Sequence, residues 1–243
     1  MVKKHLKRIA APKTWKVKRK TGTWITRPRP GAHPLNQCIT LDYVIREQLK
    51  HANTYKEAKK CIKAGNVLVD AKPRRDHKFS VGIMDVITIK DQDEHYRVVL
   101  NDHNQLVLQK IPEKQATLKL CKIVGKTIIK KKKIQLNLHD SKNVITTDDK
   151  IKVGDSIVLD LKTGKIKEHF VFEKGNSLYL TGGKHPGVIG FLEGEKKQVG
   201  LQPDVLLVKA KEDVFETAKQ FAFIVGKGAP ALVIRGKDEN DKD

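Results

Sequence analysis

The sequence predicts an α+β protein of several small domains that begins with an extended basic segment. The chain has 243 residues, which is enough for two or three small domains. Residues 41–64 carry two helix-type apolar repeats, and alternating apolar patterns typical of strands dominate after them. Residues 1–41 hold eleven lysines and arginines and no acid, so they offer too little apolar surface for a core of their own.

The charge of the chain indicates its kind of partner. The formal net charge is +21, and folding does not need such an excess, because like charges oppose compaction. We therefore expect a polyanionic partner. Three widely spaced cysteines argue against a disulfide framework and favour a reducing compartment. No apolar run approaches the ~20 residues that span a bilayer, and we expect no membrane contact.

Residues 1–40 form the predicted basic extension. Lysines and arginines can neutralise phosphates there, and Trp15 and Trp24 can stack on unpaired bases. The alternative is that one or both tryptophans pack against the protein itself. A transit peptide would also be poor in acids, but this segment has no serine and is broken by prolines. We expect the extension to order only against RNA, and its removal to leave a folded body.

Residues 41–111 form the first predicted folded domain. Thr40 is a plausible N-cap for a helix whose apolar face runs to residue 52, and Thr54 with Glu57 makes a capping box for a second helix that ends at Gly65. Strands are expected at 66–72 and 81–89. A hairpin of strands 95–101 and 105–111 is expected to close the domain.

The remaining chain is expected to be rich in strands. Residues 112–171 form a β-rich central domain in which 114–139 hold eight lysines and no acid. Residues 172–236 form a last domain, where Gly182 and Gly183 permit a turn before a short basic loop. The stretch 212–219 fits either a helical turn or a strand. Residues 237–243 are expected to be a polar tail.

Two stretches resemble known RNA-binding modules. The helix–helix–strand order of 41–89, with Gly65-x-Val67-x-Val69-Asp70, resembles the small RNA-binding domain named after bacterial ribosomal protein S-four. Gly82-Ile83-Met84-Asp85 departs from the usual Gly-Asp pair by two inserted residues, so the match is to a divergent branch. Residues 172–194, with Thr181-Gly182-Gly183 before Lys184-His185-Pro186, resemble the KOW motif of an SH3-like β-barrel.

The order of motifs over nearly the whole chain resembles one family. Lys4-His5-Leu6-Lys7-Arg8, Gly82-x-Met84-Asp85-Val86 and Phe223-Ile224-Val225-Gly226-Lys227-Gly228 are similar to landmarks of the archaeal and eukaryotic ribosomal protein family S-four-e, and the short C-terminus is similar to archaeal members. The resemblance implies a cytoplasmic, non-catalytic component of the small ribosomal subunit that holds folded ribosomal RNA. Its implied partners are that RNA and neighbouring ribosomal proteins.

The candidate RNA-binding residues are basic or aromatic and fall into four groups. The resemblance to the S-four-type domain identifies the candidates in the second helix and the loop after it. The other candidates are chosen because they are basic or aromatic and lie in segments expected to be loops. The alternative for the charged residues is that they only form a solvated surface. They are Lys3, Lys4, Lys7, Arg8, Lys13, Trp15, Lys16, Lys18, Arg19, Lys20, Trp24, Arg27 and Arg29; Lys59, Lys60, Lys63, Arg74, Arg75 and Lys78; Lys130, Lys131, Lys132 and Lys133; and Lys184 and His185.

Enzymatic alternatives find little in the sequence. RNA-modifying enzymes that share the S-four-type domain carry an Arg-Leu-Asp tripeptide, which does not occur here. No phosphate-cradling G-x-x-x-x-G-K-[ST] motif occurs, and neither C-x-x-C nor H-x-x-x-H is present to suggest zinc. We expect no catalytic residue, metal, cofactor or small-molecule substrate. A free transcription factor or RNA chaperone with a KOW domain remains an alternative.

Overall fold

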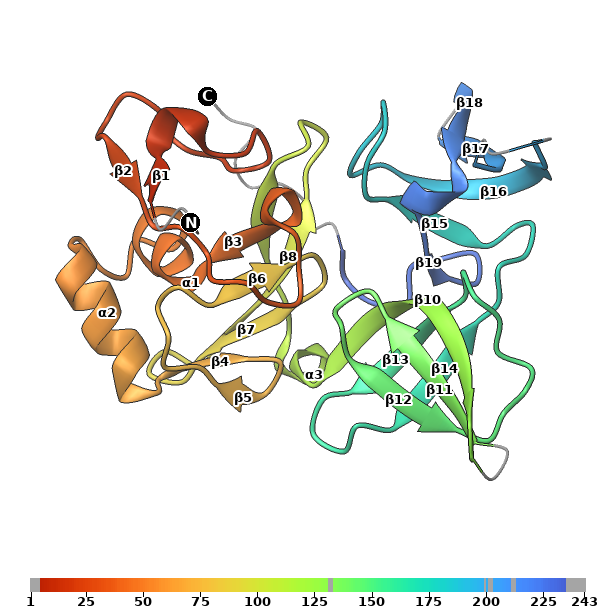
Figure 1. Ribbon diagram of the computed structural model, residues 1–243, viewed down its shortest axis with the longest axis horizontal. Coiled ribbons are helices and arrows are strands. Elements are labelled where there is room, and N and C mark those ends of the chain that lie inside the picture. Colours follow the sequence, from red (N-terminus) through yellow and green to blue (C-terminus); the bar gives the residue numbers. More distant parts are fainter. Residues whose placement is uncertain (1–4, 131–132, 199, 201–202, 211–212, 235–243) are drawn as a thin grey trace. The chain divides into compact units, whose positions relative to one another are not determined.

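The computed structural model describes residues 5–130, 133–198, 200, 203–210 and 213–234. They form two compact units, whose elements are traced in Figure 1. The first unit comprises residues up to 99 together with 105–119, and the second comprises 100–104 and 120–234. Strands dominate and helices are few and short, which agrees with the α+β, multi-domain class. Over the described residues, no helix is long and apolar enough to cross a membrane.

The first helical segment of the first unit begins at its predicted cap. The Thr40 hydroxyl accepts a hydrogen bond from the Tyr43 amide at 3.3 Å, at the start of α1 (Leu41–Tyr43). The segment then continues as one π-helical turn, Val44–Gln48, in which the Leu49 amide donates to the Val44 carbonyl at 2.9 Å. The expected apolar face is buried except for Leu49, which is half-buried. The single α-helix expected over the whole segment is wrong.

The second helix, α2 (Tyr55–Ala64), follows the predicted pattern at both ends. Thr54 and Glu57 form the capping box, which satisfies two backbone amides at the N-terminus. Gly65 ends the helix with φ at 87°, a left-handed conformation that costs glycine little. Ile62 on the inner face is fully buried. The outer face of α2 is left to its lysines.

The strands of the first unit that follow its N-terminal segment form two sheets. One pairs β3 (Cys38–Thr40), which follows a 3₁₀ turn at Leu35–Gln37, with β6 (Ser80–Gly82). The other has the order β5-β4-β7-β8-β9. Its strands, and the short helix after them, are β4 (Val67–Val69), β5 (Lys72–Pro73), β7 (Val86–Ile89), β8 (Glu94–Leu100), β9 (Leu106–Lys110) and α3 (Glu113–Ala116).

The single strand expected over 81–89 is wrong, because the chain turns in the middle of it. Met84 has φ at 68°, in the left-handed region, and separates β6 from β7. The Asp85 carboxylate accepts a hydrogen bond from the Gly82 amide at 2.8 Å and closes this turn. The two inserted residues thus allow β6 to pair with β3 while β7 joins the larger sheet.

The N-terminal segment is folded against the first unit, so the expectation that it orders only against RNA is wrong. A two-stranded ribbon pairs β1 (Leu6–Lys7) with β2 (Trp24–Ile25), and a 3₁₀ turn follows β1 at Arg8–Ala10. One face of this ribbon carries Leu6 and Ile25, which are buried. The opposite face carries Lys7 and Trp24, which are exposed.

Trp15 is the main anchor of this segment. Only 1% of its surface is exposed, and its ring centroid lies 5.7 Å from that of Tyr43. The Leu106 amide donates to the Thr14 carbonyl at 2.7 Å, and the Tyr43 hydroxyl donates to the Lys16 carbonyl at 2.5 Å. A few apolar and aromatic anchors therefore order a segment whose average composition suggested disorder.

The second unit contains two five-stranded sheets. The first has the order β12-β11-β10-β13-β14, and its buried side includes Ile123, Leu136 and Ile157. Its strands are β10 (Leu118–Ile129), which begins in the first unit, β11 (Lys133–Leu138), β12 (Asn143–Thr146), β13 (Ser156–Asp160) and β14 (Ile166–Phe170).

The second sheet of this unit has the order β18-β17-β16-β15-β19. Most of the stretch 212–219, which fits either a helical turn or a strand by sequence, forms the strand β18. Its alternating pattern is therefore the better guide to its structure. The predicted hairpin around Gly183 is confirmed, with φ of that glycine at 87°. The elements are β15 (Ser177–Leu180), β16 (Ile189–Lys196), β17 (Val205–Ala210), β18 (Asp213–Ala218), a 3₁₀ turn (Lys219–Phe221) and β19 (Ala222–Gly226).

Candidate nucleic-acid interface

The predicted interface residues differ widely in exposure. Lys3, Lys4, Lys131 and Lys132 lie outside the described residues. Arg8 and Trp15 are buried. Six residues are half-buried: Arg19, Arg27, Lys59, Arg74, Lys78 and His185. The remaining residues are exposed and can meet a ligand without rearrangement: Lys7, Lys13, Lys16, Lys18, Lys20, Trp24, Arg29, Lys60, Lys63, Arg75, Lys130, Lys133 and Lys184.

Two arginines of the N-terminal segment make hydrogen bonds within the protein. Arg8 forms a bidentate pair with Glu47, with its Nη1 2.9 Å from a Glu47 oxygen. The hydrogen bond and charge of Glu47 raise the pKa of Arg8, although burial opposes this. Arg19 donates to the carbonyls of Ile9 at 2.8 Å and Ala11 at 3.0 Å. The prediction that Arg8 contacts RNA is therefore wrong, because its guanidinium group is buried and already paired with Glu47.

The two tryptophans have opposite environments. Trp15 packs within the first unit, so the prediction that it stacks on RNA is wrong and the alternative of internal packing holds for it. Trp24 is 57% exposed, and the His5 ring lies beside it, with 5.5 Å between the ring centroids. Trp24 is thus the tryptophan of this segment that a ligand can reach.

A basic surface lies on α2 and the loop that follows β5. Lys56, Lys60 and Lys63 occupy positions i, i+4 and i+7 of the helix, so they share one exposed face. Arg75 lies at the C-terminal end of the helix, since its Nε is 3.7 Å from where a Cβ of Gly65 would stand. We call these four residues the helix patch. Lys56 was not among the predicted residues, although its spacing from Lys60 could have identified it.

The other basic residues near this patch are partly engaged. The Arg74 guanidinium lies 4.4 Å from the centroid of the Phe79 ring, a cation–π geometry. Lys59 has its Nζ 5.8 Å from the Tyr55 ring centroid. Arg29 approaches Asp76 at 3.2 Å but keeps most of its side chain exposed. These side chains can present charge to a ligand, but packing already limits their freedom.

The predicted basic residues of the second unit that the structure describes lie at strand ends or in loops. Lys130 directly follows β10, Lys133 is the first residue of β11, and both are exposed. Lys184 is exposed in the loop between β15 and β16. His185 in the same loop packs on Phe215, with 4.2 Å between their ring centroids. The loop thus presents the Lys184 ammonium to solvent beside a ring that helps to fix its shape.

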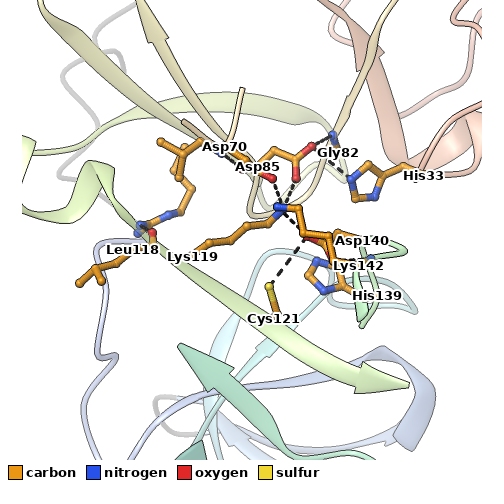
Figure 2. Close-up of polar contacts among 12 residues, drawn as sticks. His33, Asp70, Gly82, Asp85, Leu118, Lys119, Cys121, His139, Asp140 and Lys142 are labelled. Atoms are coloured by element: carbon orange, nitrogen blue, oxygen red, sulfur yellow. Dashed lines mark hydrogen bonds and ion pairs between the residues drawn. The ribbon is translucent and has the colours of Figure 1, made fainter. Parts of the chain in front are cut away.

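Sequence reasoning did not find a buried charge cluster in the first unit. Lys119 is completely buried, and its Nζ lies 2.7 Å from Asp70 and 2.5 Å from Asp85 (Figure 2). Asp85 also lies 3.1 Å from the Nε2 of His33, and the Val86 amide donates to Asp70 at 3.1 Å. The members are far apart in sequence, so no local motif could have predicted their meeting.

The electrostatics of this cluster favour the ionised form of the Asp85 carboxylate. Burial alone would raise the pKa of Asp85, but the charge of Lys119 and the hydrogen bond from His33 lower it below its ordinary value. A carboxylate held in this state neither gives up a proton nor takes one near neutral pH. With the groups buried and paired, the cluster has the character of a structural ion pair.

One group in the second unit has donor types that can bind a metal. The ligand atoms of Cys121, His139 and Asp140 lie within 4.8 Å of one another. Asp140 is already compensated, because the Lys142 ammonium lies 3.4 Å away and the Lys142 amide donates to it at 3.2 Å. The Lys122 amide approaches the Nδ1 of His139 at 3.3 Å. These hydrogen bonds and the ion pair account for the proximity of the three side chains without a bound metal.

Fold and surface together define a class of protein: a modular, cationic α+β protein with basic side chains exposed on both units. Comparisons with known proteins identify the family. The family model for the ribosomal family S4e matches residues 92–166, and that for the RS4NT domain matches residues 2–36.

The relatives are alike over nearly their whole length. The chain is 40% identical to the small ribosomal subunit protein eS4 of Methanocella arvoryzae, over 94% of this chain and 96% of that one. It is 39% identical to the protein of the same name from Methanocaldococcus jannaschii, over 95% and 97%. The crystal structure of the 30S ribosomal protein S4e of Thermoplasma acidophilum matches with a TM-score of 0.68 and 38% identity, over 79% of this chain and 96% of that one. The chain belongs to the ribosomal family S4e.

Proposed function

We propose that this protein is a structural component of the small ribosomal subunit, where it binds and stabilises folded ribosomal RNA and supports translation. The observation that carries the proposal is the similarity to archaeal small-subunit proteins over 94% or more of the chain. Its location is then the cytoplasm, within the subunit, and its partners are ribosomal RNA and adjacent ribosomal proteins. The net charge of +21 supports such a partner.

The proposed mechanism is electrostatic attraction followed by shape recognition. Exposed lysines and arginines neutralise phosphates and release counterions. A-form RNA hides its base edges in a deep groove, so a rigid protein surface recognises its shape and backbone instead. The N-terminal segment takes part as a preformed surface, because Trp15 and Arg8 fix it to the first unit. Little ordering entropy is then lost on binding.

The proposed modules are those that the sequence resembles. We assign residues 41–111 to an S-four-type RNA-binding domain with its hairpin, 112–171 to a central β domain, and 172–236 to an SH3-like barrel with a KOW motif. The antiparallel pairing of β15 with β16 around an exposed Lys184 supports the last assignment. The residues proposed to contact RNA are the exposed and half-buried ones identified above, with Lys56 added.

The proposed role is non-catalytic and needs no metal or cofactor. The Asp70–Lys119–Asp85 cluster brings two carboxylates together in the protein interior, and the Lys119 ammonium pairs with both of them. Solvent and substrates cannot reach a fully buried group without local unfolding.

Association with the small subunit tests the proposal directly. The purified protein is expected to sediment with small subunits in low salt and to protect a defined set of nucleotides from chemical probing. A mixture with large subunits, which differ in RNA and protein content, is the control. If the protein stays at the top of the gradient with small subunits, the proposed function is wrong.

The helix patch provides a sharper test of the binding surface. Replacing Lys56, Lys60 and Lys63 by glutamine is expected to weaken binding to small-subunit RNA and to reduce the slope of log affinity against log salt by ~0.7–0.9 for each phosphate that is no longer neutralised. The matched control replaces three exposed lysines of the second unit: Lys162, Lys165 and Lys174. Both variants remove the same charge, so equal slopes for the two would show that the helix patch does not bind RNA specifically.

A further inference from the structure

The outer face of the N-terminal ribbon has the features of a base-stacking platform. Trp24 stands on it with 57% of its surface exposed, although tryptophan usually buries most of its ring in folded proteins. The ribbon does not need this ring for its own stability, because Leu6 and Ile25 on the other face supply the buried contacts. The exposure of this ring therefore suggests that it binds a ligand.

The surroundings of the ring specify the charge of that ligand. Lys7 lies directly opposite Trp24 in the strand register, and cross-strand neighbours have their Cβ atoms about 4.5–5.5 Å apart. Lys18 and Lys20 are exposed on the connection that leads into β2. The first 41 residues contain no acid, and Glu47, which lies near Arg8, is already paired with it. The platform thus combines an aromatic face with positive charge.

Access to the ring is open on the side of the connecting loop. Residues 20–24 are all exposed, and a Cβ added to Gly22 would meet no atom within 4 Å. The segment is nevertheless held in place, because the Arg8 amide donates to the Thr23 carbonyl at 2.9 Å, directly before the tryptophan. A ligand can approach without moving the backbone, and the ring is positioned before it arrives.

We propose that Trp24 stacks on an unpaired nucleobase of RNA while Lys7 contacts the phosphate beside it. A flat aromatic base matches the indole ring, and its phosphate supplies the negative charge that complements this face. Base-paired RNA does not fit, because its bases are stacked on one another and leave only sugar and phosphate outside. This inference rests on the proposed RNA-binding function and names the RNA element that this site recognises.

The experiment uses the full chain and a single-stranded oligouridylate of about twelve nucleotides, compared with a duplex of equal length. Binding of the single strand is expected to quench the fluorescence of Trp24, whereas Trp15 is buried and shielded. The affinities of all variants are compared by the fluorescence anisotropy of a dye-labelled RNA, because Trp24→Ala lacks the quenched tryptophan. Trp24→Ala is expected to weaken single-strand binding about 5- to 150-fold, which corresponds to ~1–3 kcal/mol for one stacked base. Duplex binding should change by less than about twofold.

Two further variants separate stacking from other interactions. Trp24→Phe keeps an aromatic face and should retain most of the affinity, whereas Trp24→Leu keeps apolar surface only and should behave like Trp24→Ala. None of these changes alters the salt slope, because no charge is removed, while Lys7→Gln should reduce it by ~0.7. Equal affinity of Trp24→Leu and the original protein would show that stacking is absent.

Failure of this inference is distinct from failure of the proposed function. If the original protein binds RNA with a steep salt dependence but Trp24→Ala binds the single strand equally well, only the stacking site is wrong. If neither protein binds single-stranded RNA nor small-subunit RNA, both proposals are wrong. If Trp24→Ala instead fails to bind a neighbouring protein while RNA binding is unchanged, the ring serves a protein interface and the inference is overturned.

Discussion

Replacing Lys119 by alanine is expected to lower the free energy of unfolding of the first unit by about 3–5 kcal/mol. Lys119 is fully buried between Asp70 and Asp85, so its removal leaves two carboxylates in the interior without their cation. Breaking one partner of a buried pair costs this much because the remaining charge has lost its compensation. A loss of this size is a large part of the stability of a small domain.

Urea unfolding followed by tryptophan fluorescence measures this loss. Both tryptophans, Trp15 and Trp24, lie in the first unit, so the signal reports on that unit alone. Lys110→Ala is the control, because Lys110 pairs with Glu94 at 2.8 Å but leaves 66% of its own side chain exposed. Exposed pairs contribute about 1 kcal/mol or less. Similar midpoints for the two variants would contradict a stabilising role for the cluster.

A compensated variant tests the electrostatic cause. Lys119→Met combined with Asp70→Asn and Asp85→Asn removes all three charges, and it should recover much of the stability that Lys119→Met alone loses. The pKa of Asp85 is depressed in the folded protein, so its contribution is present above its unfolded pKa and is lost as the pH falls through the folded value. The difference between the original protein and Lys119→Ala should therefore narrow in acid, below about pH 4.

Local features of the fold follow from the sequence, and the cluster shows why others do not. The capping box of Thr54 and Glu57 involves residues three positions apart, so its chemistry can be predicted from the spacing alone. Lys119, by contrast, meets Asp70 and Asp85 across separations of 49 and 34 residues. In the sequence it is one of many lysines in an acid-free stretch, and only the fold distinguishes it from an exposed one.

The candidate interface shows the same limit. Composition shows that the chain carries a net charge of +21, and eleven of its lysines and arginines, with no acid, lie in the first 41 residues. It does not reveal that Arg8 pairs with Glu47, which is 39 residues away in the sequence, or that the Trp15 ring packs against Tyr43. Average charge predicted disorder for this segment, whereas a few anchors at long range decide the outcome.

The second large effect is expected for Trp15. Trp15→Ala should lower the free energy of unfolding of the first unit by about 3–5 kcal/mol, because it empties a ring-sized volume in the packing against Tyr43. Deletion of residues 1–31 should destabilise the unit at least as much, since it also removes the partner of Glu47. Far-UV circular dichroism during urea unfolding measures both, because the substitution removes a fluorophore.

Trp24→Ala is the matched control for this prediction. It removes the same side chain from the same segment, but from a position that is 57% exposed, so the change in unfolding free energy should stay within about 0.5 kcal/mol. The effects on RNA binding should be reversed. Trp24→Ala should bind single-stranded RNA more weakly, whereas the folded fraction of Trp15→Ala should bind it as the original protein does. If Trp15→Ala unfolds at the same urea concentration as Trp24→Ala, the N-terminal segment is not part of the core, and its order must come from RNA.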